Sequence, residues 1–260
     1  MSEASSQTTQ QVRLALAAVL DGARLTESAT TREPIARKGS LRDLVTAVDV
    51  EIDHLLTRRF TEAGWAVCSE EQATPTPPPA AFWAIDPLDG TANFAHGLPQ
   101  YAISAGWVER GRCRLGVVCA PALDELFFTL GPDRALRNGT PIVHVHRAPA
   151  EALVAASFPA TAGDAAYALF HQVNESTQGC LRTGSAAVNL CYTAAGVLQG
   201  AYGVAAKVWD VAGGIAIAQA AGCEAQLHIH DDGLTVDYLV GSREVVAHVQ
   251  RLAQAHGLWR

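Results

Sequence analysis

The chain is poor in basic side chains. Of its 260 residues, 19 are Lys or Arg and 26 are Asp or Glu, which gives a formal net charge of -7. Its lysines are Lys38 and Lys207, and its longest basic run is the pair Arg58-Arg59. Surfaces that bind nucleic acid need clustered positive charge to neutralise phosphates. The composition therefore argues against a nucleic-acid partner.

Long apolar runs are also lacking. No stretch approaches the roughly 20 apolar residues that a helix needs to cross a bilayer. Residues 1–7, Met-Ser-Glu-Ala-Ser-Ser-Gln, have neither the basic segment nor the apolar segment of a secretory signal. We therefore expect no membrane partner and a cytoplasmic location.

Paired cysteines are missing too. The chain has six cysteines, none spaced as Cys-x-x-Cys, so the sequence indicates neither a zinc cluster nor a redox dithiol. We expect all of them to be reduced core thiols. Apolar residues, by contrast, make up 49% of the chain, which is enough for a sizeable core. We expect a single unit over residues 1–260, with lobes at about 10–142 and 143–260.

Hydrophobic periodicity and turn signals predict the elements of both lobes. In the first lobe we expect helices at 10–25 and 48–64, strands at 65–68 and 82–85, and an antiparallel meander of strands at 101–109, 112–119 and 125–130. The second lobe alternates, with strands at 153–157, 200–204, 224–227 and 236–240 and helices at 164–173, 185–198, 210–221 and 242–256. Asp164, Ser185 and Asp210 stand where the N-caps of three of these helices are expected.

Residues 83–94, Trp-Ala-Ile-Asp-Pro-Leu-Asp-Gly-Thr-Ala-Asn-Phe, look like a metal site. We expect a buried strand to stop at Asp86-Pro87, because proline lacks an N–H donor and fixes φ. Asp86 and Asp89 then face each other across a turn, so their carboxylates can converge on one point with the Leu88 carbonyl between them. Carboxylate and carbonyl oxygens are the ligands that hard cations prefer.

Gly90 and Thr91 follow this turn directly and are expected to open a helix. The first N–H groups of a helix have no partner within the helix, and they favour a bound anion such as a phosphate. A cation site and a phosphate site would therefore adjoin.

Four other acidic residues are ambiguous when each is taken alone. Asp49 lies in the first turn of a predicted helix, where the helix dipole favours a carboxylate. Glu70 and Glu71 follow a strand, yet adjacent glutamates are more often solvated than ligands. Asp210 stands at a helix start, where an ordinary N-cap explains it better.

Two longer sequences carry a family resemblance. Asp-Pro-Leu-Asp-Gly-Thr-Ala-Asn-Phe at 86–94 and Trp-Asp-Val-Ala-Gly-Gly at 209–214 closely resemble the signature motifs of the inositol monophosphatase family of metal-dependent phosphomonoesterases. Residues 43–49, 70–71 and 184–191 are also similar to that family, in the same order and at similar spacings. The resemblance covers roughly residues 10–255, and the agreement of several independent motifs argues against coincidence.

The resemblance implies a fold and a set of metal ligands. The fold would be a layered α-β-α-β-α sandwich of the sugar-phosphatase type, between the α+β and α/β classes, and the protein would be a homodimer. Glu70, Asp86 and the Leu88 carbonyl would hold a first Mg²⁺. Asp86, Asp89 and Asp210 would hold a second, and a third, weaker Mg²⁺ would lie near Glu70. All-oxygen ligation favours Mg²⁺ or Mn²⁺ over zinc.

The resemblance also implies roles in hydrolysis. Thr91, hydrogen-bonded to Asp49, would orient the attacking water close to Glu70, and the Gly90 and Thr91 N–H groups would hold the phosphate. Lys38 would add an auxiliary charge. No covalent phospho-enzyme is needed, and sensitivity to Li⁺ is expected because Li⁺ resembles Mg²⁺ in radius.

The substrate wall implied by the family comprises Asp89, Gly184, Ser185, Ala186 and Gly203. Inositol-selective members usually place a glutamate where this chain has Gly203, which weakens the case for inositol. We still rank inositol monophosphate first, with histidinol phosphate, fructose 1,6-bisphosphate and 3′-phosphoadenosine nucleotides as alternatives. The rival class is a non-catalytic regulatory protein on the same fold. Such a protein would be expected to have lost a ligand, and none is lost here.

Overall fold

The computed structural model describes residues 3–37 and 44–259, so the predictions for Lys38 and for Asp43 in the 43–49 motif lie outside the described residues. The helices are α1 (Glu3–Ser28), α2 (Ala47–Glu62), α3 (Thr91–Ala95), α4 (Gly163–Ser176), α5 (Ala186–Ala194), α6 (Val208–Ala220) and α7 (Arg243–Ala255). The strands are β1 (Pro34–Arg37), β2 (Leu44–Thr46), β3 (Val67–Ser69), β4 (Ala81–Asp89), β5 (Ala102–Glu109), β6 (Arg112–Ala120), β7 (Glu125–Thr129), β8 (Ala135–Arg137), β9 (Thr140–Ile142), β10 (Leu153–Ser157), β11 (Gly179–Leu181), β12 (Gly200–Lys207), β13 (Glu224–Ile229) and β14 (Thr235–Gly241).

These strands form two large sheets and one small one. The first has seven strands in the order β3-β4-β5-β6-β7-β8-β9, antiparallel except for the pair β3 and β4. The second has five strands in the order β11-β10-β12-β14-β13, with β10 parallel to both of its neighbours. Strands β1 and β2 pair separately. The seven-stranded sheet is formed by residues before the predicted lobe boundary, and the five-stranded sheet by residues after it. The division into two lobes stays a prediction.

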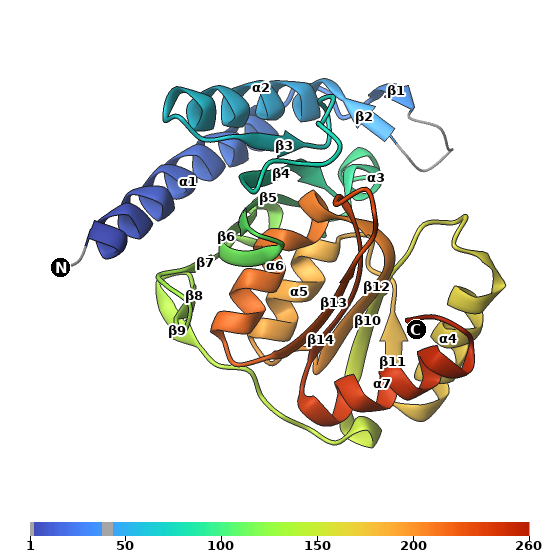
Figure 1. Cartoon of the computed structure of the whole chain (residues 1–260). Helices are drawn as coiled ribbons and strands as arrows, with labels where there is room; N and C mark the ends of the chain where they lie inside the picture. The colour runs from blue at the N-terminus through green and yellow to red at the C-terminus, as the bar shows by residue number, and fades with distance from the viewer. Residues whose placement is uncertain (1–2, 38–43, 260) are drawn as a thin grey trace.

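The elements stack in five layers (Figure 1). Helices α1 and α2 cover the outer face of the seven-stranded sheet, α5 and α6 lie between the two large sheets, and α4 and α7 cover the five-stranded sheet. Each layer buries its own apolar residues, because a sheet and an amphipathic helix each expose an apolar face that must be covered. The predicted α-β-α-β-α sandwich is confirmed.

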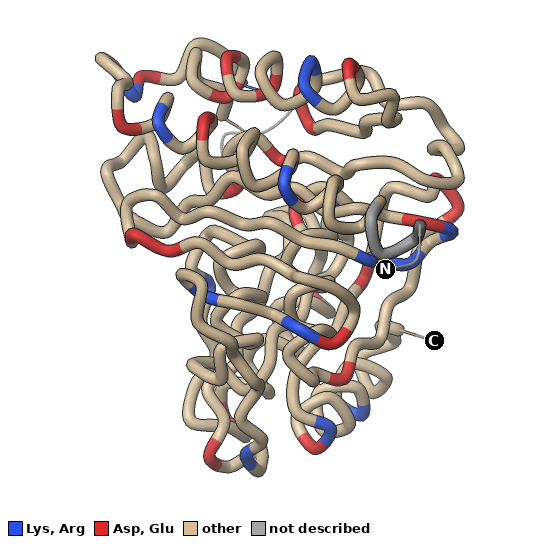
Figure 2. The backbone as a smooth tube through the Cα atoms, turned by 90° about the vertical axis from the view of Figure 1, so that its left-hand side faces the viewer, with Lys and Arg blue, Asp and Glu red and all other residues tan. Residues whose placement is uncertain are grey.

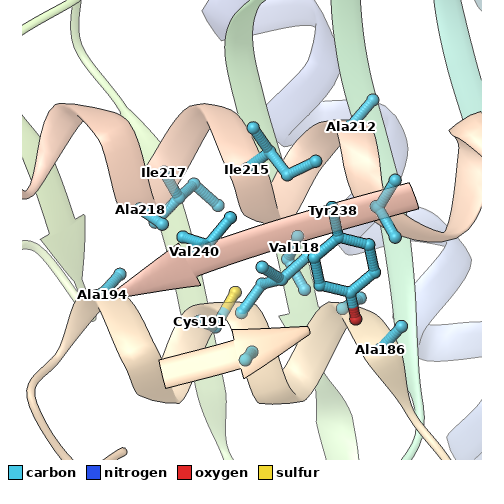
Figure 3. Close-up of a cluster of buried hydrophobic side chains, with 14 of the residues drawn as sticks. Val118, Ala186, Cys191, Ala194, Ala212, Ile215, Ile217, Ala218, Tyr238 and Val240 are labelled. Carbon is cyan, nitrogen blue, oxygen red and sulfur yellow. The ribbon is translucent and has the colours of Figure 1, made fainter. Parts of the chain in front are cut away.

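Three clusters of buried side chains fill the spaces between these layers. One joins α1 and α2 to the seven-stranded sheet, and a second joins the five-stranded sheet to α4 and α7. The largest lies around α5 and α6 in the middle layer (Figure 3), where Val118, Ile215 and Val240 come from three different layers. The central helices are therefore enclosed on both sides, and their N-terminal ends are held in place.

The position of α6 depends on backbone contact with the seven-stranded sheet. A Cβ atom at Gly116 would lie 2.1 Å from the carbonyl oxygen of Gly213, and one at Gly106 would lie 2.4 Å from its nitrogen. Distances this short leave no room for any side chain, so three glycines allow helix and sheet to touch. This contact fixes the position of the first turn of α6 relative to the sheet.

Several local predictions need correction. Strand β4 does not stop at Asp86, because it continues to Asp89 through a break in its register with β5. The proline lies within the strand at this bulge, where no hydrogen bond from its nitrogen is needed. Asp86 and Asp89 lie on either side of the break in register. Asp164 and Asp210 are the second and third residues of their helices, not N-caps. Ser185 is an N-cap, and its Oγ accepts a hydrogen bond of 3.2 Å from the Val188 N–H.

Two predictions from composition can be compared with the fold. All six cysteines are free thiols, and all but Cys113 are buried, as predicted. Within residues 3–37 and 44–259, no helix is long and apolar enough to cross a membrane. Acidic and basic residues are mixed along the backbone in the view of Figure 2.

Candidate functional site

The predicted site residues come together where two strands end and four helices begin. Glu70 follows β3, and its N–H donates a hydrogen bond of 3.2 Å to the carbonyl of Ile85 in the neighbouring strand β4. Asp86 and Asp89 lie in the last four residues of strand β4, and Asp210 lies in the first turn of α6. The remaining contributors are the first residues of α2, α3 and α5. Strand pairing and helix packing thus carry residues from distant parts of the sequence to one place.

Three carboxylates form a compact acidic group. Oxygens of Glu70, Asp86 and Asp210 all lie within 4.8 Å of one another. Asp86 is 2% exposed, and one oxygen of Asp210 accepts a hydrogen bond of 3.2 Å from the Lys207 N–H. Ionised carboxylates at such distances repel one another strongly unless a cation lies between them. The donor set is entirely oxygen, which fits a hard divalent cation.

Titration reflects this crowding. Burial raises the pKa of Asp86 well above its usual value, and the negative charges of Glu70, Asp89 and Asp210 raise it further. Burial likewise raises the pKa of Asp210, with added repulsion from Glu70 and Asp89. Without a cation, these groups are therefore harder to ionise than ordinary carboxyls, and cation binding would compete with protons at each of them.

Asp89 lies beside this group without belonging to it. Its Oδ2 accepts hydrogen bonds from the Ser185 Oγ at 2.5 Å and from the Ala187 N–H at 2.7 Å. Burial raises the pKa of Asp89 to about 6, although these two bonds act in the opposite direction. The side chain is thus tied to the start of α5, and it connects the metal motif to the middle layer of helices.

Thr91 connects the acidic strand end to Asp49. Its Oγ1 lies 2.9 Å from Asp49 Oδ1 and 2.9 Å from the carbonyl oxygen of Leu88. Asp49 is buried and also accepts a hydrogen bond of 2.8 Å from the Thr46 N–H. Burial raises the pKa of Asp49. A hydroxyl that donates to this carboxylate leaves its own oxygen able to accept a hydrogen bond from water.

The backbone at the start of α3 packs closely against the backbone at Gln100. Gly90 has φ of +94°, and a Cβ atom there would lie 2.8 Å from the Gln100 carbonyl oxygen, so this position requires glycine. Asn93 Nδ2 donates to the carbonyls of Gln100 at 2.6 Å and Thr183 at 2.8 Å. These bonds fix the first turn of α3 against the loop that precedes α5.

A cavity of about 690 Å³ opens beside the acidic group. Of the predicted substrate wall, Asp89, Gly184 and Ala186 line this cavity, whereas Ser185 and Gly203 are not among its lining residues. Ser185 instead donates a hydrogen bond to Asp89, which itself lines the cavity. Sequence reasoning missed one run of four residues in the wall, namely Ala156, Ser157, Phe158 and Pro159.

The position of Gly203 explains why it is absent from the wall. A Cβ atom there would lie 2.2 Å from Cε1 of Tyr238 on the adjacent strand β14, so the tyrosine ring occupies the space of any side chain at 203. The Tyr238 hydroxyl points toward Ala186 at the start of α5 (Figure 3). Beyond Gly203, β12 bulges, and Ala205 adopts φ of +53° with its N–H bonded to Asp237 Oδ1 at 2.7 Å. This bulge carries Ala205 and Ala206 into the wall.

Comparison with known proteins agrees with the fold and the motifs. A family model described as the inositol monophosphatase family matches residues 3–257. The chain is 38% identical over 144 residues to the Nus factor SuhB of Pasteurella multocida, a match that spans 54% of each chain. It is 32% identical over 194 residues to a fructose-1,6-bisphosphatase/inositol-1-monophosphatase of Thermotoga maritima, covering 72% of this chain and 73% of the relative.

A solved structure shows the same fold. The Thermotoga maritima IMPase TM1415 superposes with a TM-score of 0.83 at 24% identity, covering 95% of this chain and 98% of the other. The family match extends over nearly the whole sequence, including every motif on which the resemblance rests. The chain therefore belongs to the inositol monophosphatase family of phosphomonoester hydrolases.

Proposed function

We propose that this protein is a Mg²⁺-dependent phosphomonoesterase that hydrolyses a small phosphorylated polyol or alcohol by direct attack of water. One observation carries the proposal: oxygens of Glu70, Asp86 and Asp210 lie within 4.8 Å of one another, with Asp86 buried and Glu70 and Asp210 half-buried. Such an arrangement is costly without a cation, and hard oxygen donors favour Mg²⁺, with Mn²⁺ as a substitute.

Each residue of the site has a proposed role. Glu70, Asp86 and the Leu88 carbonyl would hold one Mg²⁺, Asp86, Asp89 and Asp210 would hold the second, and a third would lie near Glu70. When bound, these ions supply positive charge that stabilises the phosphoryl oxygens and lowers the pKa of a bound water. Asp89 is already held by Ser185 and Ala187 through Oδ2.

The chain's own groups would orient the reactants. Thr91 donates to Asp49 and can accept a hydrogen bond from the attacking water, which places that water on one side of the phosphorus. Glu70, at the edge of the acidic group, is the second residue proposed to position this water. The N–H groups of Gly90 and Thr91, at the start of α3, would hold the phosphate oxygens.

The first experiment measures phosphate release from inositol 1-phosphate with saturating Mg²⁺ and with EDTA. We expect Asp210→Asn to lower kcat by at least 10²-fold, since it removes a proposed ligand without changing the size of the side chain. Asp133→Asn is the matched control, because Asp133 is exposed, lies between β7 and β8 and is outside the cavity lining. Equal turnover of parent and Asp210→Asn protein in saturating Mg²⁺ would exclude the proposal.

The identity of the substrate is a finer proposal. Inositol monophosphate ranks first, and the name of the Thermotoga maritima relative, which joins two activities, supports testing fructose 1,6-bisphosphate beside it. Histidinol phosphate and 3′-phosphoadenosine nucleotides complete the panel, to be compared by kcat/KM. Inhibition by Li⁺ and a homodimer remain predictions from the family, and a cytoplasmic location remains a prediction from the sequence.

A further inference from the structure

Arg182 stands in the wall of the cavity that the acidic group also lines. It lies in the loop between β11 and α5 and lines the same cavity as Glu70, Asp89 and Asp210. Within residues 3–37 and 44–259, it forms no ion pair with an acidic side chain, whereas Arg137 pairs with Glu125. Its positive charge is therefore not neutralised by a neighbouring carboxylate.

The Arg182 side chain is nevertheless held in a defined position. Its guanidinium carbon lies 4.0 Å from the centre of the Phe158 ring, and its Nη2 donates a hydrogen bond of 2.6 Å to the Phe158 carbonyl. Stacking on an aromatic face and one carbonyl bond fix the plane of the group. A guanidinium has five N–H donors. The Phe158 carbonyl occupies one side of it, which leaves donors for a second acceptor.

The loop that carries Arg182 is also fastened to the phosphate side of the site. The carbonyl of Thr183, the next residue, accepts the 2.8 Å hydrogen bond from Asn93 in α3, and Ser185 donates to Asp89. The distance from the guanidinium to the proposed phosphate position is thus set by short links and not by a freely moving loop. A substrate held at the acidic group would share its cavity with a preorganised cation.

The other cation of the wall is already engaged. Lys207 Nζ donates to Thr235 Oγ1 at 2.9 Å and lies 3.8 Å from a carboxylate oxygen of Asp232. Its charge is shared with an acidic partner, so Arg182 is the stronger attractor for an anion in the cavity. The cavity of about 690 Å³ has the volume of a small-molecule site.

We infer that Arg182 binds a second anionic group of the substrate, a phosphate or a carboxylate, through a charge-assisted and bidentate hydrogen-bond pair. This inference rests on the proposed phosphatase function, and it places one substrate class above inositol monophosphate, which the family resemblance ranks first. The preferred substrate is a phosphomonoester with a second negative group remote from the scissile phosphate. Fructose 1,6-bisphosphate and 3′-phosphoadenosine 5′-phosphate have such a group, and inositol 1-phosphate lacks one.

The test compares two substrates in matched variants. We measure kcat/KM for fructose 1,6-bisphosphate and for inositol 1-phosphate in the parent, in Arg182→Gln and in Arg182→Lys. The control is Arg243→Gln, which removes an exposed arginine paired with Glu224 outside the cavity lining. The ratio of the two kcat/KM values is the readout, because it does not depend on the fraction of active enzyme.

The expected result is a loss confined to the bisphosphate. Arg182→Gln should lower kcat/KM for fructose 1,6-bisphosphate by about 10- to 100-fold, mostly through KM, as expected for one lost hydrogen-bonded charge. The value for inositol 1-phosphate should change by less than about twofold. Arg182→Lys should fall between, since it keeps the charge and loses the fork.

Two outcomes overturn the inference, and they are distinguishable. If the parent releases phosphate but Arg182→Gln affects both substrates equally, or affects neither, Arg182 does not select a second anionic group and the inference alone fails. If the parent releases no phosphate from any substrate of the panel with Mg²⁺, the proposed function fails and the inference fails with it.

Discussion

Replacing Asp89 with asparagine should stabilise the metal-free protein at neutral pH. Burial raises the pKa of Asp89 from 3.8 to about 6 in the folded protein. An acid whose folded pKa is raised contributes stability that is fully present below about pH 4 and is lost as the pH rises through about 6. At 1.36 kcal/mol per pKa unit, a rise of about two units means that ionised Asp89 costs about 3 kcal/mol at pH 8.

Asparagine cannot ionise, and its carbonyl oxygen can still accept from Ser185 and Ala187. We therefore expect the Asp89→Asn protein in EDTA to gain about 3 kcal/mol at pH 8 and roughly half of that at pH 5, measured by urea unfolding. Asp232 is the control, because a hydrogen bond from Thr235 lowers its pKa to about 2, and its replacement by asparagine should not stabilise the protein.

Mg²⁺ at about 1,000 times the dissociation constant should reverse the order at pH 8, since cation binding to the folded parent then adds about 4.1 kcal/mol, which exceeds the cost of about 3 kcal/mol of ionised Asp89. The reasoning is refuted if the Asp89→Asn protein in EDTA is less stable than the parent at pH 8. It is also refuted if the difference between the two is the same at pH 5 and pH 8.

Three further substitutions test separate parts of the site and its support. Thr91→Val should lower kcat by about 10²- to 10⁴-fold with little change in KM, because it removes the hydroxyl proposed to orient water; unchanged phosphate release would exclude that role. Gly116→Ala should cost about 1–3 kcal/mol in urea unfolding, since its Cβ would lie 2.1 Å from the Gly213 carbonyl oxygen; full stability would show that α6 can shift. Asp237→Ala should raise KM, because it removes the acceptor of the Ala205 N–H that holds the β12 bulge in the cavity wall. Adding Ala205→Gly should restore part of the loss, because glycine adopts the positive φ without strain. An Asp237→Ala protein with parental KM would show that the bulge does not shape the cavity.

The acidic group was predictable because each member lies at a marked boundary in the sequence. Asp86 precedes a proline at the end of an apolar run, Glu70 follows a short strand, and Asp210 follows a half-buried tryptophan at a helix start. Each signal alone fits an ordinary cap or loop. The resemblance of several motifs to one family indicated that these residues form one site. No local pattern predicts that a residue near 70 and one near 210 lie close together in the fold.

The cavity wall was harder to predict because it depends on pairing between distant strands. The ring of Tyr238 covers Gly203 only because β12 and β14 pair in one register, and the positive φ of Ala205 arises at the bulge in that pairing. Alanine gives no sequence signal for a left-handed backbone, which usually calls for glycine or asparagine. Residues 182–187 fit a pocket wall as well as an ordinary loop and cap, and no sequence signal predicted that Arg182 stacks on Phe158.

Metal ligation and substrate choice share one set of links in this fold. Asp89, a proposed ligand, is held by Ser185 and the Ala187 N–H at the start of α5, and the same loop carries Arg182. Moving this loop to admit a different substrate would shift the donors that fix Asp89 and weaken the second cation site. Substrate range should therefore change more easily through the β12 bulge around Ala205, which contacts the cavity without holding a ligand.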